Sequence, residues 1–146
     1  MKNYIFGNLT DWGIVLDKLK ELSESKELDN HQDELIRLLR FDQNWRLREA
    51  AIESLPRIAN PSLDLAREVF SIIKRKDLYY DVRILATDSL GKLIAIIVNK
   101  SAFDKDILKQ FVMEIIKNMD VLLASPEPPK FHDALQNSMN QIKEAI

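Results

Sequence analysis

The chain has no cysteine and only three glycines among its 146 residues. Without cysteine it can form neither a disulfide nor a thiolate metal site, and thiol catalysis is excluded. Three glycines and five prolines are too few for the many tight turns of a β-sandwich. The composition therefore favours a helical domain that is held together by its apolar core.

An excess of charge of either sign is also missing, because the net charge is only -2. A protein that binds nucleic acid through bulk electrostatics normally carries a basic surplus, so this balance argues against nucleic acid as the partner. The longest apolar run, residues 93–98, is far too short to span a bilayer, and the first residues lack the apolar core of a signal peptide. We therefore expect a cytoplasmic protein that does not contact membranes.

Apolar residues recur at helical spacing along most of the chain, and no segment reads as a strand. In the first expected helix, Trp12 lies on the apolar face together with Leu16 and Leu19. The acidic run from Glu21 to Glu34 is interpreted as a solvated loop. The sequence predicts six or seven helices, over residues 11–23, 30–41, 44–59, 61–76, 79–98, 101–123 and 130–145.

Several of these helices begin at residues that are typical of helix caps. Thr10 is expected to cap the first helix and Asp29 the second. Pro61 follows Asn60 and is expected at the first helical position of the fourth helix. Ser101 and Asp104 resemble a capping box at the start of the sixth helix.

The chain contains an internal repeat with a period of 35 residues. Residues 42–58 align with residues 77–93 without a gap. A period of this size with two helices per unit is typical of α-solenoids. Five of the aligned pairs are identical: Asp42/Asp77, Arg48/Arg83, Ala51/Ala86, Ser54/Ser89 and Leu55/Leu90.

The two aligned segments resemble HEAT repeats. The features that carry the resemblance are an aspartate in the turn between two helices, an arginine six residues later, and then a small residue and a leucine. The resemblance implies one all-α domain, an α-α superhelix spanning residues 1–146. Its full repeats would cover residues 30–59 and 60–98, with a capping helix at 10–23 and a degenerate repeat at 101–146.

Physical reasoning gives each repeated residue a role. The stripes Leu47/Ala51/Leu55/Ile58 and Val82/Ala86/Leu90/Leu93 are expected to be buried between helices, and the last helix continues them with Phe131, Leu135, Met139 and Ile142. The carboxylates of Asp42 and Asp77 can accept backbone N–H bonds in their turns. Arg48 and Arg83 are expected to bridge adjacent turns by charge-assisted hydrogen bonds.

No constellation of catalytic or metal-binding residues is apparent. His31 and His132 are far apart in the sequence, and neither lies in a metal-binding spacing. His31 is interpreted as a surface residue, while His132 takes the place of the repeated arginine in the last unit. Lys100, Lys105, Lys109 and Lys117 alternate with acidic residues and form only a weak basic patch. We expect no enzyme activity, no cofactor and no metal.

The remaining hypothesis is a protein-binding module that uses the concave face of a short solenoid. The residues opposite the buried stripes are Glu49, Glu53 and Arg57 in one repeat and Ile84, Asp88 and Lys92 in the next, continued by Asp133, Asn137 and Gln141. Trp45 and Tyr80 are expected at the rim, where aromatic side chains can anchor a partner.

Two alternatives from other classes stay open. One is a toxin-neutralising immunity protein, a small acidic binder that differs from the first hypothesis mainly in its partner. The other is an enzyme such as a HEAT-like bilin lyase or alkylpurine DNA glycosylase, although a glycosylase needs a basic cleft that this composition disfavours.

Overall fold

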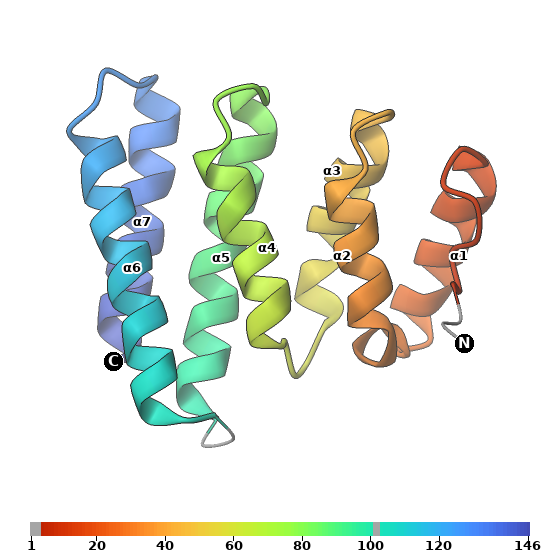
Figure 1. Cartoon of the computed structure of the whole chain (residues 1–146), viewed down its shortest axis with the longest axis horizontal. Coiled ribbons are helices and arrows are strands. Elements are labelled where there is room, and N and C mark those ends of the chain that lie inside the picture. The colour runs from red at the N-terminus through yellow and green to blue at the C-terminus, as the bar shows by residue number, and fades with distance from the viewer. Residues whose placement is uncertain (1–3, 101–102) are drawn as a thin grey trace. The chain divides into compact units, whose positions relative to one another are not determined.

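The computed structural model describes residues 4–100 and 103–146, and helices are its only regular elements over those residues (Figure 1). This confirms the predicted all-α class. No described helix is long and apolar enough to cross a membrane. The α-helices are α1 (Trp12–Glu24), α2 (Gln32–Arg40), α3 (Trp45–Ser54), α4 (Leu63–Lys74), α5 (Tyr80–Asn99), α6 (Lys105–Leu123) and α7 (Pro129–Ala145), with short 3-10 helices η1 (Leu28–His31) and η2 (Leu55–Arg57).

The chain divides into two compact units, Met1–Glu68 and Val69–Ile146, and the boundary falls inside α4. In the first unit, α3 packs against both α1 and α2. In the second unit, α7 packs against both α5 and α6. Each unit therefore has its own apolar core, formed where three helices meet.

The apolar stripes that the sequence predicts are the centres of these cores. Leu47 and Ala51 of α3 are fully buried, as are Ala86 and Leu90 of α5. In α7 the stripe is equally buried, because Phe131 and its successors are at most a few per cent exposed. The prediction that these positions face the interior is confirmed.

Several predicted caps are wrong, because the side chains bind elsewhere. The N-cap of α1 is Asp11, and Thr10 hydrogen bonds to Asn8. The carboxylate of Asp29 accepts hydrogen bonds from the backbone N–H groups of Ala59 and Asn60, at 3.0 and 2.8 Å, and so does not cap the second helix. An aspartate near a helix start is free to cap any exposed backbone N–H group that folding brings within reach.

The starts of two later helices also differ from the prediction. Helix α4 begins at Leu63, after Pro61, and the hydroxyl of Ser62 accepts the N–H of Leu65 at 3.1 Å. Helix α6 is capped by Asp104, whose carboxylate accepts the N–H groups of Asp106 and Ile107. Ser101, which the sequence analysis placed in this cap, lies outside the described residues.

The end of α1 is closed by a residue with an unusual backbone conformation. Lys26 has a φ of 62°, in the left-handed region that glycine usually fills. The N–H of Glu27 donates to the carbonyl of Leu22 at 3.1 Å, which is the hydrogen bond of a Schellman motif. The backbone therefore turns sharply here and leads directly into η1.

The acidic run from Glu21 to Glu34 is not entirely a solvated loop, because Glu34 is only 7% exposed. Its carboxylate accepts the backbone N–H of Phe6 at 3.2 Å and two hydrogen bonds from Arg37, at 2.7 and 2.9 Å. Arg37 also donates to the carbonyl of Gly7 at 2.9 Å. This ion pair between the buried Glu34 and the half-buried Arg37 fastens the segment before α1 to α2, and hydrophobic periodicity does not predict it.

Helices α5 and α7 approach each other closely at Gly91. A Cβ atom at this position would lie 2.7 Å from the hydroxyl of Ser138 and 3.1 Å from its Cα. The first distance is shorter than real Cβ contacts and the second is tighter than an ordinary van der Waals contact, so a larger residue here would require its neighbours in α7 to shift. Gly91 is therefore a packing residue of the second unit.

The end of each of three helices is held by a side chain from the helix that follows it. In every case the acceptor is the carbonyl of the penultimate residue of the first helix, a group that has no partner within its own helix. The contacts are Arg48 Nε to Leu39 O at 2.9 Å, Arg83 Nε to Ile73 O at 3.0 Å, and His132 Nε2 to Leu122 O at 3.2 Å.

The predicted bridges between adjacent turns are replaced by these contacts within hairpins. Arg48 also hydrogen bonds to Asp42 of its own hairpin. Asp77 accepts two hydrogen bonds from Arg75, at 3.1 and 2.6 Å. Arg83 lies over the rings of Tyr80 and Phe131. In the second repeat Asp77 is therefore hydrogen bonded to Arg75, whereas Arg83 donates to the carbonyl of Ile73.

Candidate functional site

The predicted binding residues of the first unit form one ridge along α3 and η2. Trp45, Glu49, Glu53 and Arg57 are each four residues apart, and this spacing places them on one side of a helix. Trp45, Glu53 and Arg57 are exposed, while Glu49 is half-buried. We call these four residues the α3 ridge.

The predicted residues of the second unit form a corresponding ridge along α5, consisting of Tyr80, Ile84, Asp88 and Lys92. Burial raises the pKa of Asp88, and the positive charge of Lys92 only partly offsets this effect. The α5 ridge lies in the other compact unit, and its alignment with the α3 ridge on one surface stays a prediction.

Tyr80 was predicted as an anchor at the rim of the binding surface, but its hydroxyl and its ring both contact residues of its own unit. Its hydroxyl donates to the carboxylate of Glu127 at 2.5 Å, and its ring packs against Phe131 at a centroid distance of 5.6 Å. The hydrogen bond to Glu127 stabilises the neutral phenol and is the main reason why the pKa of Tyr80 is raised. Tyr79, one residue earlier, is 77% exposed and is the more accessible aromatic side chain here.

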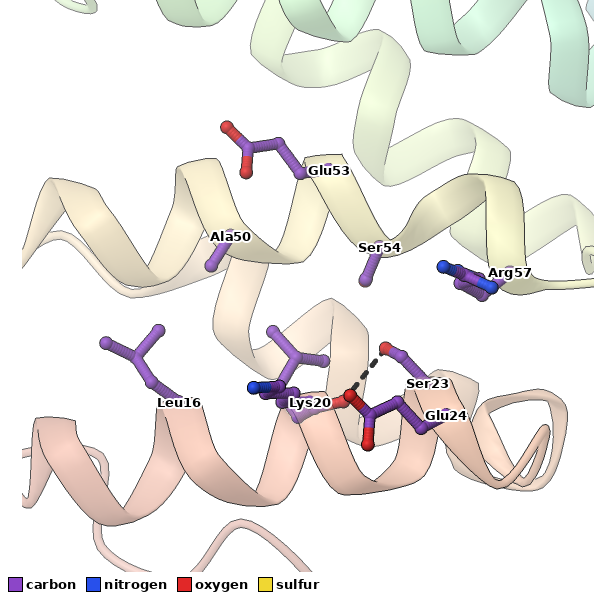
Figure 2. A pocket seen from close by; sticks show the side chains of 9 residues that line it. Leu16, Lys20, Ser23, Glu24, Ala50, Glu53, Ser54 and Arg57 are labelled. Atoms are coloured by element: carbon purple, nitrogen blue, oxygen red, sulfur yellow. Dashed lines mark hydrogen bonds between the residues drawn. The ribbon is translucent and has the colours of Figure 1, made fainter.

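A hollow of about 280 Å³ lies between α1 and α3 in the first unit (Figure 2). Figure 2 shows Ala50 and Ser54 of α3 facing Leu16 and Ser23 of α1. The hydroxyl of Ser23 donates to the carbonyl of Leu19 at 2.8 Å, so it is already occupied. The lining also includes Lys20, Glu24, Glu53 and Arg57, which brings two predicted residues of the α3 ridge into a concave site.

The two helices beside the hollow run in the same direction. Leu16 lies opposite Ala50 near one end, and Glu24 lies near Arg57 at the other (Figure 2). Because α1 begins at Trp12 and α3 begins at Trp45, both tryptophans of the chain lie toward the same end of this pair. Trp12, Leu16, Lys20 and Glu24 are spaced by four residues, and we call them the α1 ridge.

Trp12 was predicted to share the apolar face of the first helix with Leu16 and Leu19, but 47% of its surface is exposed. Trp12 is the first residue of its helix. Trp45 is 55% exposed. A sequence signal could have identified Trp12 as a candidate binding residue. Each residue of the α1 ridge lies 33 positions before a residue of the α3 ridge, so Trp12 corresponds to Trp45.

The lining of the hollow carries charges of both signs. Lys20 and Glu24 come from α1, and Glu53 and Arg57 come from α3 and η2. Within the described part of the chain, none of the four side chains has a hydrogen bond or an ion pair. In Figure 2 the carboxylate of Glu53 points away from α1, at the rim of the hollow. These groups are available to a partner that carries both acidic and basic groups.

The histidines do not form a reactive centre in the described structure. His31 is half-buried near the start of α2. His132 belongs to α7 and contacts the end of α6. Its Nε2 atom lies 3.2 and 2.9 Å from the carbonyl oxygens of Leu122 and Ser125. Among the residues that the structure covers, no three His, Cys, Asp or Glu side chains are grouped to hold a metal ion.

Comparisons with protein-family models, with curated proteins and with solved structures found no match for this chain.

Proposed function

We propose that the chain is a non-enzymatic protein-binding module, and that its partner binds the surface formed by the α1 ridge, the α3 ridge and the hollow between them. The helical hairpins are proposed to stack as in a HEAT-type solenoid. Three hairpins whose ends are held by an equivalent side chain on the penultimate carbonyl support this repeat interpretation.

The observation that carries the proposal is the exposure of both tryptophans. Trp12 and Trp45 begin two parallel helices, and about half of each side chain is exposed to solvent. Tryptophan is highly buried on average in folded proteins and is enriched among the residues that dominate the energy of protein interfaces. Two exposed tryptophans toward the same end of one helix pair therefore favour a protein partner.

The charged side chains that line the hollow support specificity for the same kind of partner. Complementary charges raise the association rate and exclude partners with the wrong pattern. Lys20 and Arg57 would receive acidic groups of the partner, and Glu24 and Glu53 would receive basic ones. Apolar anchors beside a charged region are the usual arrangement of an apolar interface core and a polar rim.

The experiment uses the full chain as bait in an extract of the source cell, followed by titration with the purified partner. We expect Trp12→Ala and Trp45→Ala to weaken binding by about 30-fold each, equal to the roughly 2 kcal/mol of an interface hot spot. Glu53→Lys should lower the association rate and its dependence on salt.

The matched control is Glu21→Lys, because Glu21 is exposed on α1 and does not line the hollow. This variant should bind like the wild type. Equal affinity of the wild type and both tryptophan variants for the purified partner would overturn the proposed surface.

A further inference from the structure

A second concave surface lies in the other compact unit, far in sequence from the tryptophans. It is a groove of about 420 Å³ between α6, the end of α5 and the last residue of the chain. Its apolar lining consists of Val98, Leu108, Val112, Met113, Ile116 and Ile146. None of these residues belongs to the proposed α1–α3 surface.

The groove is unusually apolar for a solvent-exposed surface. Met113 is 60% exposed and Ile146 is 66% exposed, so their side chains lie in water and not in the core. Exposed apolar surface with a polar edge commonly marks an interaction site. Because these side chains are so open, the groove would cover one side of an elongated ligand and would not enclose a small molecule, of which pockets usually bury about 70–90%.

The charged residues of the groove are all of one sign. Lys105 and Lys109 complete its lining, and none of the other side chains that line it is charged. The two lysines are one helical turn apart on α6, and within the described residues neither forms an ion pair or a hydrogen bond. The edge of the groove therefore has two adjacent positive charges available to a ligand.

We infer that this groove binds an amphipathic, acidic helix of a protein partner, with the apolar face of that helix against Met113 and Ile116 and its acidic residues beside Lys105 and Lys109. A helix in a groove uses apolar side chains at positions i, i+3, i+4 and i+7. Carboxylates spaced four residues apart on the partner match the spacing of the two lysines. The surface is separate from the α1–α3 hollow and does not depend on it.

The test uses two fluorescent peptides of about 16 residues, roughly four helical turns, that differ only in the sign of their flanking charges. Both have leucines at i, i+3, i+4 and i+7, flanked by glutamates in one peptide and by lysines in the other. We expect the full chain to bind the glutamate peptide at least about tenfold more tightly, equal to about 1.4 kcal/mol. Fluorescence anisotropy gives both affinities.

Two variants show where the peptide binds. The double variant Lys105→Glu/Lys109→Glu should reverse the preference and bind the lysine peptide better. Met113→Asp should weaken both peptides about tenfold or more, and its side chain is exposed enough for the fold to tolerate the change, which circular dichroism checks. Lys117→Glu is the control for the charge reversal, because Lys117 is exposed on α6 but does not line the groove.

Four results would overturn the inference. They are failure to bind the glutamate peptide, equal binding of the two peptides, displacement of the bound peptide by laurate at a matching affinity, and a dimer of the chain that Met113→Asp dissociates. The last two would assign the groove to an acyl chain or to a second copy. Trp45→Ala should leave peptide binding unchanged, so failure of the α1–α3 surface and failure of this groove are distinguishable.

Discussion

At the scale of single residues, the buried carboxylate of Glu34 has a shifted pKa. Burial by itself would raise its pKa, but the hydrogen bonds from Arg37 and Phe6 and the charge of Arg37 outweigh this effect and lower the pKa. The ionised form is therefore favoured in the folded state. Since the same pair holds Phe6 and Gly7, its charge state affects how firmly the segment before α1 is attached.

Glu34→Gln should destabilise the chain at neutral pH by about 1–3 kcal/mol, because the variant loses the negative charge and one of the two acceptor oxygens that bind Arg37 and Phe6. A lowered carboxyl pKa contributes stability that is fully present above the pKa of the unfolded state, about 4.3, and is lost as the pH falls through the folded value. The difference between wild type and variant should therefore shrink below about pH 4. Urea denaturation at pH 7 and pH 3 measures it.

The control is Glu21→Gln, since Glu21 is exposed and forms only a surface ion pair with Lys18. Exposed pairs contribute about 0–1 kcal/mol, so this variant should follow the wild type at both pH values. If Glu34→Gln lowers the free energy of unfolding by the same amount at pH 3 and pH 7, the negative charge of Glu34 does not stabilise the fold.

At the scale of elements, the hairpins depend on the side chains that hold the ends of α2 and α4. Arg48 and Arg83 are each at most 3% exposed. Arg48→Met or Arg83→Met should keep the apolar stem and lose the hydrogen bond to the preceding carbonyl. We expect a loss of about 1.5–3 kcal/mol for each, as for buried hydrogen bonds to charged groups. Thermal unfolding followed by circular dichroism measures the loss.

The loss is expected to be smaller for Arg83, because its Nη2 atom is buried without a hydrogen-bond partner among the described residues. That atom already carries a desolvation cost which the methionine variant removes. Arg46→Met is the matched control, since Arg46 is exposed on the same helix as Arg48. If Arg46→Met destabilises the fold as much as Arg48→Met, the hydrogen bond from Arg48 to the carbonyl of Leu39 does not stabilise the hairpin.

The helices and their buried faces could be predicted from the sequence, because apolar spacing is a local property. Leu47, Ala51 and Leu55 are buried as expected, and α6 ends at Leu123 as predicted. The partners of polar side chains could not be predicted in the same way. Asp29 binds a backbone N–H group 30 residues away. A capping rule that considers only neighbours in sequence cannot predict such a contact.

The candidate site could be predicted only in part, for a related reason. Glu53 and Arg57 were placed correctly on an exposed face by counting residues around one helix. The hollow itself needs α1 beside α3 in parallel, and no single-helix pattern contains this information. Trp12 has the spacing of the apolar face of α1 and is nevertheless about half-exposed, because helical spacing alone does not show which positions of a face a neighbouring helix covers.

At the scale of the whole molecule, the two compact units share one helix. Residues 63–68 of α4 belong to the first unit and residues 69–74 to the second. Leu65 and Ala66 are fully buried on one side of this boundary, and Val69 is fully buried on the other. Because unfolding of either part breaks hydrogen bonds of the same helix, we expect the two units to unfold in one cooperative transition.

Both tryptophans lie in the first unit, so their fluorescence reports on that unit, whereas ellipticity at 222 nm reports on every helix. Coincident melting curves from the two probes are the expected result, since agreement between independent probes is a test of two-state unfolding. Ala66→Gly should cost about 1 kcal/mol or more as a buried glycine in a helix interior, and should shift both curves together by about 2–8 °C. A fluorescence curve that shifts while the ellipticity curve separates into two steps would mean that α4 does not couple the units, and that each unfolds by itself.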